Sequence, residues 1–101
     1  NTSGMMYITK LIGRADGRAT VDAQYRPSSG GNASLVSNLW AGFPGWNSGT
    51  CTMPDPRPTI ALSVLLTEGE TVYAVESLYD YAPLTRYVLN RDPLLYSLTI
   101  L

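Results

Sequence analysis

The sequence predicts an α+β domain: a small antiparallel β-sheet of three to five strands, with one short helix and a long loop rich in proline and glycine. Two observations carry this prediction. Segments in which apolar and polar side chains alternate, the pattern of half-buried strands, occur in both halves of the chain. Between them, from Pro27 to Pro58, five prolines and five glycines gather where little regular structure is expected.

The longest predicted strand runs from Thr71 to Tyr81, after a turn at Glu68-Gly69. Its alternate residues form two faces. One face carries Val72, Ala74, Glu76, Leu78 and Asp80, and the other carries Thr71, Tyr73, Val75, Ser77, Tyr79 and Tyr81. Because the run is longer than a usual strand of ~5–6 residues, we expect it to be the central strand. Pro83 ends it, since proline lacks the backbone donor.

The clearest hairpin is predicted for Met5–Ile12 and Ala19–Tyr25, joined at Asp16-Gly17. This dipeptide suits a two-residue type I′ turn. Such a turn pairs Ile12 with Val21, Lys10 with Ala23, and Ile8 with Tyr25. We expect this face to pack on the core, and the opposite face, which includes Thr9 and Leu11, to be mostly wet.

Three further segments complete the expected fold. Asn32–Ala41 predicts the short helix, with Asn32 as N-cap and Gly42 as the stop. Ile60–Leu66 is apolar throughout and is either a strand paired with the long one or one or two helical turns. Leu94–Leu101 predicts a last strand.

Size and composition exclude several classes of function. At 101 residues the chain is a single domain, 1–101. A net charge of −1 gives no electrostatic reason to expect nucleic acid as a partner. The absence of histidine removes the usual component of acid–base catalysis and of zinc sites. We therefore predict no cofactor and no metal.

The carboxylates offer no catalytic pair either. Glu76 and Asp80 share a strand face, but at ~3.3 Å per residue they would lie roughly 13 Å apart. Glycosidase carboxylates lie at ~5–9.5 Å. We predict that the protein is not an enzyme and has no catalytic residues.

The sequence has one cysteine and no long apolar run. Cys51 cannot form an internal disulfide, so we expect a free thiol, most often a buried one, an intermolecular bridge, or a partner cysteine in a segment absent from this sequence. No run of ~18 apolar residues that could span a membrane occurs.

One stretch resembles a known family. Val75-Glu76, followed by Tyr79-Asp80-Tyr81-Ala82-Pro83-Leu84, resembles the C-terminal part of the TadE/TadF-like minor pseudopilins of tight-adherence (Flp) type IV pili. In that family a Gly-rich turn, a Val-rich strand with a Glu, and a Tyr-x-Tyr-x-Pro sequence follow one another. A weaker likeness lies in the hairpin Ile8–Tyr25.

The resemblance implies a structural protein that primes or helps assemble an adhesion pilus. Its partners would be other pilin or pseudopilin subunits and pilus-assembly proteins. It also implies an extracytoplasmic location, with an N-terminal hydrophobic helix, absent from this sequence, as the membrane anchor. The chain would then be the soluble head.

Such a head makes its contacts through shape and main-chain pairing. The candidate contact residues are Trp40, Phe43, Trp46, Glu76 and Tyr81. The first three lie among glycines and prolines, where they either plug one end of the sheet or form a binding surface. Because an unpaired buried carboxylate is unfavourable, Glu76 is either exposed to water or engaged by a partner such as Arg86 or Arg91.

A second class of function remains open. A small secreted binding module, such as a protease inhibitor, would use the proline-rich stretch Thr50–Pro58 as its exposed loop. Prolines suit that role because a rigid loop loses less entropy on binding.

Overall fold

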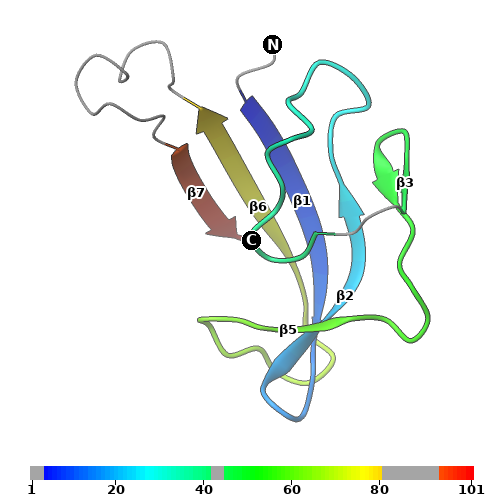
Figure 1. Ribbon diagram of the computed structural model, residues 1–101. Helices are drawn as coiled ribbons and strands as arrows, with labels where there is room; N and C mark the ends of the chain where they lie inside the picture. Colours follow the sequence, from blue (N-terminus) through cyan, green and yellow to red (C-terminus); the bar gives the residue numbers. More distant parts are fainter. Residues whose placement is uncertain (1–3, 42–44, 81–93) are drawn as a thin grey trace.

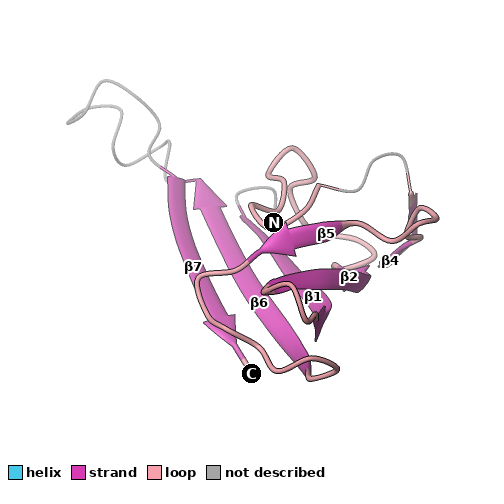
Figure 2. Cartoon of the chain, turned by 90° about the horizontal axis from the view of Figure 1, so that it is seen from below, coloured by secondary structure: helices cyan, strands magenta, loops and turns pink. Residues whose placement is uncertain are grey.

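The computed structural model describes residues 4–41, 45–80 and 94–101, and every regular element in these ranges is a strand (Figures 1 and 2). The strands are β1 (Gly4–Gly13), β2 (Arg18–Tyr25), β3 (Trp46–Asn47), β4 (Thr50–Cys51), β5 (Thr59–Ala61), β6 (Thr71–Asp80) and β7 (Leu94–Ile100). They form one antiparallel sheet in the order β3-β4-β2-β1-β6-β7, with β5 also paired to β2. The described chain is therefore all-β, and the predicted α+β class is wrong.

The two strands predicted in the second half of the chain are confirmed. β6 lies between β1 and β7 and buries Val72, Ala74, Glu76 and Leu78, the face that the alternation separates from the other. The last residue of the predicted strand, Tyr81, lies outside the described residues. The alternative hairpin of Ile60–Leu66 with this strand is wrong, because both edges of β6 are taken by β1 and β7 and the short β5 pairs with β2 instead.

The first hairpin is confirmed in position, and its turn differs in type. The N–H of Arg14 donates to the carbonyl of Arg18 at 3.0 Å, and only Gly17 has a positive φ, 82°. This is a three-residue loop closed by a glycine in the left-handed region. It shifts the pairing by one residue relative to the predicted turn.

A β-bulge at Asp22 reverses that shift. Leu11 pairs with Val21, but Lys10 pairs with Ala23, so two residues of β2 oppose one step of β1. The predicted pairs Lys10–Ala23 and Ile8–Tyr25 are therefore correct, and the predicted pair Ile12–Val21 is wrong.

The faces of β1 are opposite to those predicted, whereas Val21 of β2 is buried as predicted, because the longer turn sets it opposite Leu11. Thr9 and Leu11 are fully buried, whereas Ile8, Lys10 and Ile12 are half-buried on the other side, which we call the outer face. The reason lies elsewhere in the chain, since the segments after β2 pack on the Leu11 side. The apolar residues that cover it there are Leu39, Trp40, Met53, Ile60, Leu62 and Leu66.

The segment 32–41 forms no helix. Its main chain is bonded to polar side chains from the three long strands beneath it. The Tyr7 hydroxyl donates to the Leu35 carbonyl at 2.6 Å. The Asn38 N–H donates to a Glu76 carboxylate oxygen at 2.9 Å, and the Gln24 amide donates to the Trp40 carbonyl at 2.9 Å.

These bonds explain why the helix prediction is wrong. A single short helix is only marginally stable in water, even where no other hydrogen bonds compete for its main chain. Here Ser37 adds a local alternative, because its hydroxyl accepts the N–H groups of Leu39 and Trp40 at 3.1 and 3.3 Å. Side-chain hydrogen bonds of this kind compete with helix formation.

Candidate functional site

Of the five predicted contact residues, the three that the structure describes, Trp40, Trp46 and Glu76, lie in different places and do not form one surface. Phe43 and Tyr81 lie outside the described residues. Trp40 is half-buried against the core beside β2, and Trp46 is half-buried in β3 against a separate cluster around Tyr7. Glu76 is fully buried in β6. The three described residues therefore contribute mainly to internal packing.

Trp46 illustrates the packing role. Its ring lies 6.0 Å from the ring of Tyr7, and the Arg26 guanidinium carbon lies 4.1 Å from its centroid. The cation–π contact and the aromatic pair hold β3 against the sheet. The aromatic residues were expected either to pack at one end of the sheet or to form a binding surface. The geometry of Trp46 fits packing at the end of the sheet.

Glu76 is not exposed to water, so the alternative in which it meets solvent is wrong. One carboxylate oxygen accepts the Ser37 hydroxyl. The other accepts the Asn38 N–H at 2.9 Å and the Tyr96 hydroxyl at 2.6 Å. Three neutral donors thus satisfy the buried carboxylate, as its burial requires. The arginines considered as partners, Arg86 and Arg91, lie outside the described residues.

The Glu76 bonds join β7 to the rest of the domain. Burial of its hydroxyl, together with donation to Glu76, raises the pKa of Tyr96 above its ordinary value near 10. Tyr96 therefore stays protonated and keeps donating across neutral pH. Through it, β7 is attached to the same carboxylate that holds the segment 37–40 on β6.

The most exposed apolar surface of the sheet lies on β7. This strand is the last in the sheet order, and no described strand pairs with its outer edge (Figure 1). Leu95 is 51% exposed, and Tyr96 and Leu98, on the opposite face, are each 38% exposed. Both faces of the strand therefore present apolar side chains, next to an open line of main-chain groups.

The hydrogen-bond pattern shows which main-chain groups of β7 point away from β6. Tyr73 and Leu101 exchange both backbone bonds, at 3.2 and 2.8 Å. Because bonded and non-bonded pairs alternate in an antiparallel ladder, the odd-numbered residues of β7 bond to β6 and the even-numbered ones point away. The outward-facing residues are Leu94, Tyr96, Leu98 and Ile100.

Nothing in the sequence of β7 protects this edge. Natural sheets guard exposed edges with charged side chains, proline, bulges or very short strands. Residues 94–101 contain no charged residue and no proline. Their pairing with β6 is regular from Leu94 to Ile100. An unprotected strand of this length is a template for pairing with another strand.

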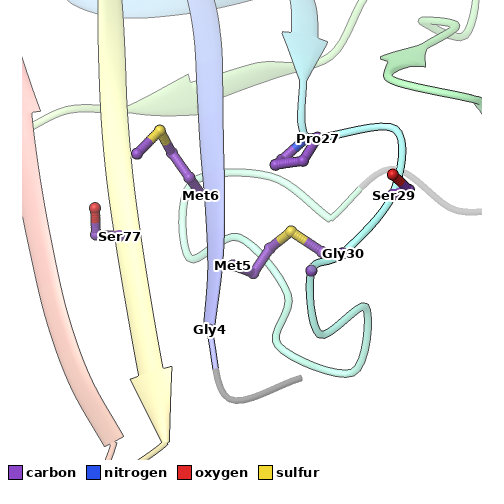
Figure 3. Close-up of a pocket in the computed structure, with 8 residues that line it drawn as sticks. Gly4, Met5, Met6, Pro27, Ser29, Gly30 and Ser77 are labelled. Carbon is purple, nitrogen blue, oxygen red and sulfur yellow. The ribbon is translucent and has the colours of Figure 1, made fainter. Parts of the chain in front are cut away.

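Two of the described hollows on the surface differ in lining: one, beside the first turn, is lined by the charged residues Arg14, Asp16 and Glu68, and the other has no charged lining. The hollow without charged lining, about 350 Å³, lies between the start of β1 and the loop after β2 (Figure 3). Met5 points into that loop, toward Gly30, and Met6 points to the other side of β1. No titratable side chain lines it, whereas ligand sites need a few convergent polar groups. In the described ranges no cluster of acidic, cysteine or histidine residues could hold a metal ion.

Comparison with known proteins adds no family. No protein-family model, curated protein or solved structure matches the chain. The residues that the structure describes include no helix long and apolar enough to cross a membrane.

The sequence pattern did not predict that β7 lies at the edge of the sheet, although the sequence contains a signal for it. Leu94–Leu101 predicts a strand, but its place in the sheet depends on pairings far along the chain. The usable signal is composition, since the last eight residues are mostly apolar, include the β-formers Tyr96, Thr99 and Ile100, and carry no charge.

Proposed function

We propose that the chain is a structural, non-enzymatic domain that assembles with another protein subunit by β-strand addition at β7. The observation that carries the proposal is the unprotected outer edge of this strand, with its outward main-chain groups at every second residue. Main-chain hydrogen bonds supply affinity in this mode, and the exposed side chains supply selectivity.

The resemblance of Val75–Leu84 to the TadE/TadF-like pseudopilins gives this assembly a specific setting. In that setting the partners are pilus subunits or pilus-assembly proteins, and the location is extracytoplasmic. Half of the motif, from Tyr81 onward, lies outside the described residues. The edge at β7 therefore supports the assembly role independently of the pilus setting.

The alternative, a binding module that uses Thr50–Pro58, has less support from the geometry. Thr50 and Cys51 form β4, and Met53 packs on the core. Arg57 donates to the Asp22 carbonyl at 2.6 Å, and its guanidinium also lies 3.4 Å from the Asp22 carboxylate. Thr52 and the residues from Pro54 to Arg57 are exposed, as this alternative expects, but both ends of the loop are bonded to β2.

The test uses the intact protein, at a concentration low enough for it to be a monomer by size-exclusion chromatography, and a synthetic strand-forming peptide of alternating valine and threonine with added terminal lysines for solubility. We expect the peptide to slow amide hydrogen exchange at Tyr96, Leu98 and Ile100 by at least about tenfold, because each would gain a main-chain acceptor. The amides of Leu95, Ser97 and Thr99, already bonded to β6, serve as the internal control.

A matched pair of variants separates main-chain pairing from side-chain contact. Leu98→Pro removes one outward donor, which an edge strand tolerates, whereas Leu98→Ala removes only the side chain. We expect the proline variant to lose the peptide effect and the alanine variant to retain most of it, with circular dichroism showing that both fold. The proposal fails if the peptide leaves the outward amides unchanged in the unsubstituted protein.

A further inference from the structure

Resting on the proposed function, we propose that the strand added at β7 is β7 of a second copy of this chain. The two strands would run antiparallel about a two-fold axis at Ser97. The inference names the partner, which the open edge by itself leaves unspecified.

The register follows from the outward groups. A bonded pair needs an outward residue on each strand, so even-numbered residues must face even-numbered residues. Of the possible two-fold arrangements, the one centred on Ser97 gives each of the four outward-facing residues of β7 a partner. It sets Tyr96 against Leu98, and Leu94 against Ile100, in both directions. Centring on Tyr96 or on Leu98 shortens the overlap.

The side chains suit a copy of the same strand. Each side chain of β7 then meets a side chain of the same strand, and because residues 94–101 carry no charge, no charged group is left unpaired in the contact. The arrangement sets Tyr96 beside Leu98 of the second copy, on one sheet face. These two residues are each 38% exposed in the single chain. Aromatic–aliphatic cross-strand pairs are stabilising.

The other edge of the sheet is a poor partner for β7. The outer edge of β2 is covered by β4 and β5, and the terminal strand β3 has only two residues. A head-to-tail arrangement would therefore leave most of β7 unpaired. A two-fold contact closes on itself, so this edge joins two subunits and builds no filament alone.

Disulfide trapping tests both the partner and the register. Ser97 faces Ser97 in a non-bonded pair, where Cα atoms lie ~4.5 Å apart, within the reach of a disulfide. Thr99 lies on the same face, but its two copies would be about 13 Å apart at ~3.3 Å per residue. The matched variants are Ser97→Cys and Thr99→Cys, each with Cys51→Ala to leave one thiol.

We expect Ser97→Cys to form a disulfide-linked dimer at least about tenfold faster than Thr99→Cys under mild oxidation, since positioned thiols have a high effective concentration. Equal rates for the two variants would overturn the inference, because random collision explains them. If neither variant forms a dimer while the peptide still slows exchange at the outward amides, the partner is a different protein and only this inference fails. If the peptide effect is also absent, the proposed function fails with it.

Discussion

The outer edges of β2 and β7 differ: the first is covered by other segments of the chain, and the second has no described strand paired with it. Along the outer edge of β2, β4 pairs with Gln24 and Tyr25, and β5 pairs with the residues from Arg18 to Thr20. Between them the Val21 N–H donates to the Pro58 carbonyl at 2.9 Å. Along the outer edge of β7, no described residue supplies such a bond.

The difference shows how one chain can end a sheet on one side and leave it extendable on the other. The β2 side is covered by short strands with prolines and an ion pair between them, which are the features that keep edges from pairing with other chains. The β7 side is long, regular and uncharged. Within the described residues only the covered edge therefore has a fixed partner, and experiments on each edge should give different results.

The largest effect is expected from removing the carboxylate that holds β7. Glu76→Leu leaves the Ser37 hydroxyl, the Asn38 N–H and the Tyr96 hydroxyl without an acceptor. Leaving a buried donor unpaired costs roughly 1–3 kcal/mol; this applies in full to Ser37 and in part to Asn38 and Tyr96, which are partly exposed, so we expect a loss of about 3 kcal/mol in the free energy of unfolding. Urea denaturation at neutral pH measures this loss.

Glu76→Gln is the control for shape. It keeps one acceptor oxygen and nearly the same volume, so we expect a smaller loss, about half of that caused by Glu76→Leu. If the leucine variant is as stable as the unsubstituted protein, the carboxylate does not hold β7, and the attachment of this strand comes from its backbone pairing alone.

The next effect concerns the covered edge. A Cβ at Gly45 would lie 2.6 Å from the Thr52 carbonyl oxygen and 3.1 Å from Cys51 Sγ. Gly45→Ala therefore pushes β3 and β4 apart and weakens the bond from the Thr52 N–H to the Gly45 carbonyl, 2.7 Å long. We expect a loss of about 2 kcal/mol.

The readout of this second prediction is local as well as global. Thermal denaturation gives the stability. Hydrogen exchange should show faster exchange at Arg26, whose N–H donates to the Gly49 carbonyl at 3.0 Å. Asn47→Ala, an exposed change in the same short hairpin, is the control. Unchanged protection at Arg26 in Gly45→Ala would show that the cover of the β2 edge does not depend on this close approach.

The strands were predictable because their signals are local. The alternation in Thr71–Asp80 identifies both the strand and its buried face, and the composition of Leu94–Leu101 identifies the last strand. In the first hairpin, Asp16-Gly17 locates the turn. The register at Lys10 and Ile8 is correct only because the bulge at Asp22 offsets the extra turn residue, and no sequence rule foresees that bulge.

The remaining features depend on contacts distant in sequence. Segment 32–41 has a helical pattern, but Tyr7, Gln24 and Glu76 from three different strands bind its main chain. The same segment decides which face of β1 is buried. Glu76 was identified as unusual because it shares a face with apolar residues. Its donors could not be named, since Ser37 and Tyr96 lie 39 and 20 positions away.

The smallest effect tests whether charge or backbone holds the covered edge. The Arg57 side chain is 52% exposed and lies 3.4 Å from the Asp22 carboxylate, which also faces Lys10 at 3.3 Å. Exposed ion pairs contribute ~0.2–1 kcal/mol and weaken with salt. We expect Arg57→Ala to lower the free energy of unfolding by about 0.5 kcal/mol at low ionic strength, and by less in high salt.

Lys10→Ala, which removes the other cation from the same carboxylate, is the matched control and should have a similar, salt-sensitive effect. In both variants the Val21 N–H keeps its bond to Pro58, so we expect the β2 edge to remain closed, with protected amide exchange at Val21. A loss above about 2 kcal/mol for Arg57→Ala would contradict this, because exposed pairs do not reach that size. The contrast between the edges would then rest on side-chain anchoring of the 53–58 loop rather than on main-chain pairing.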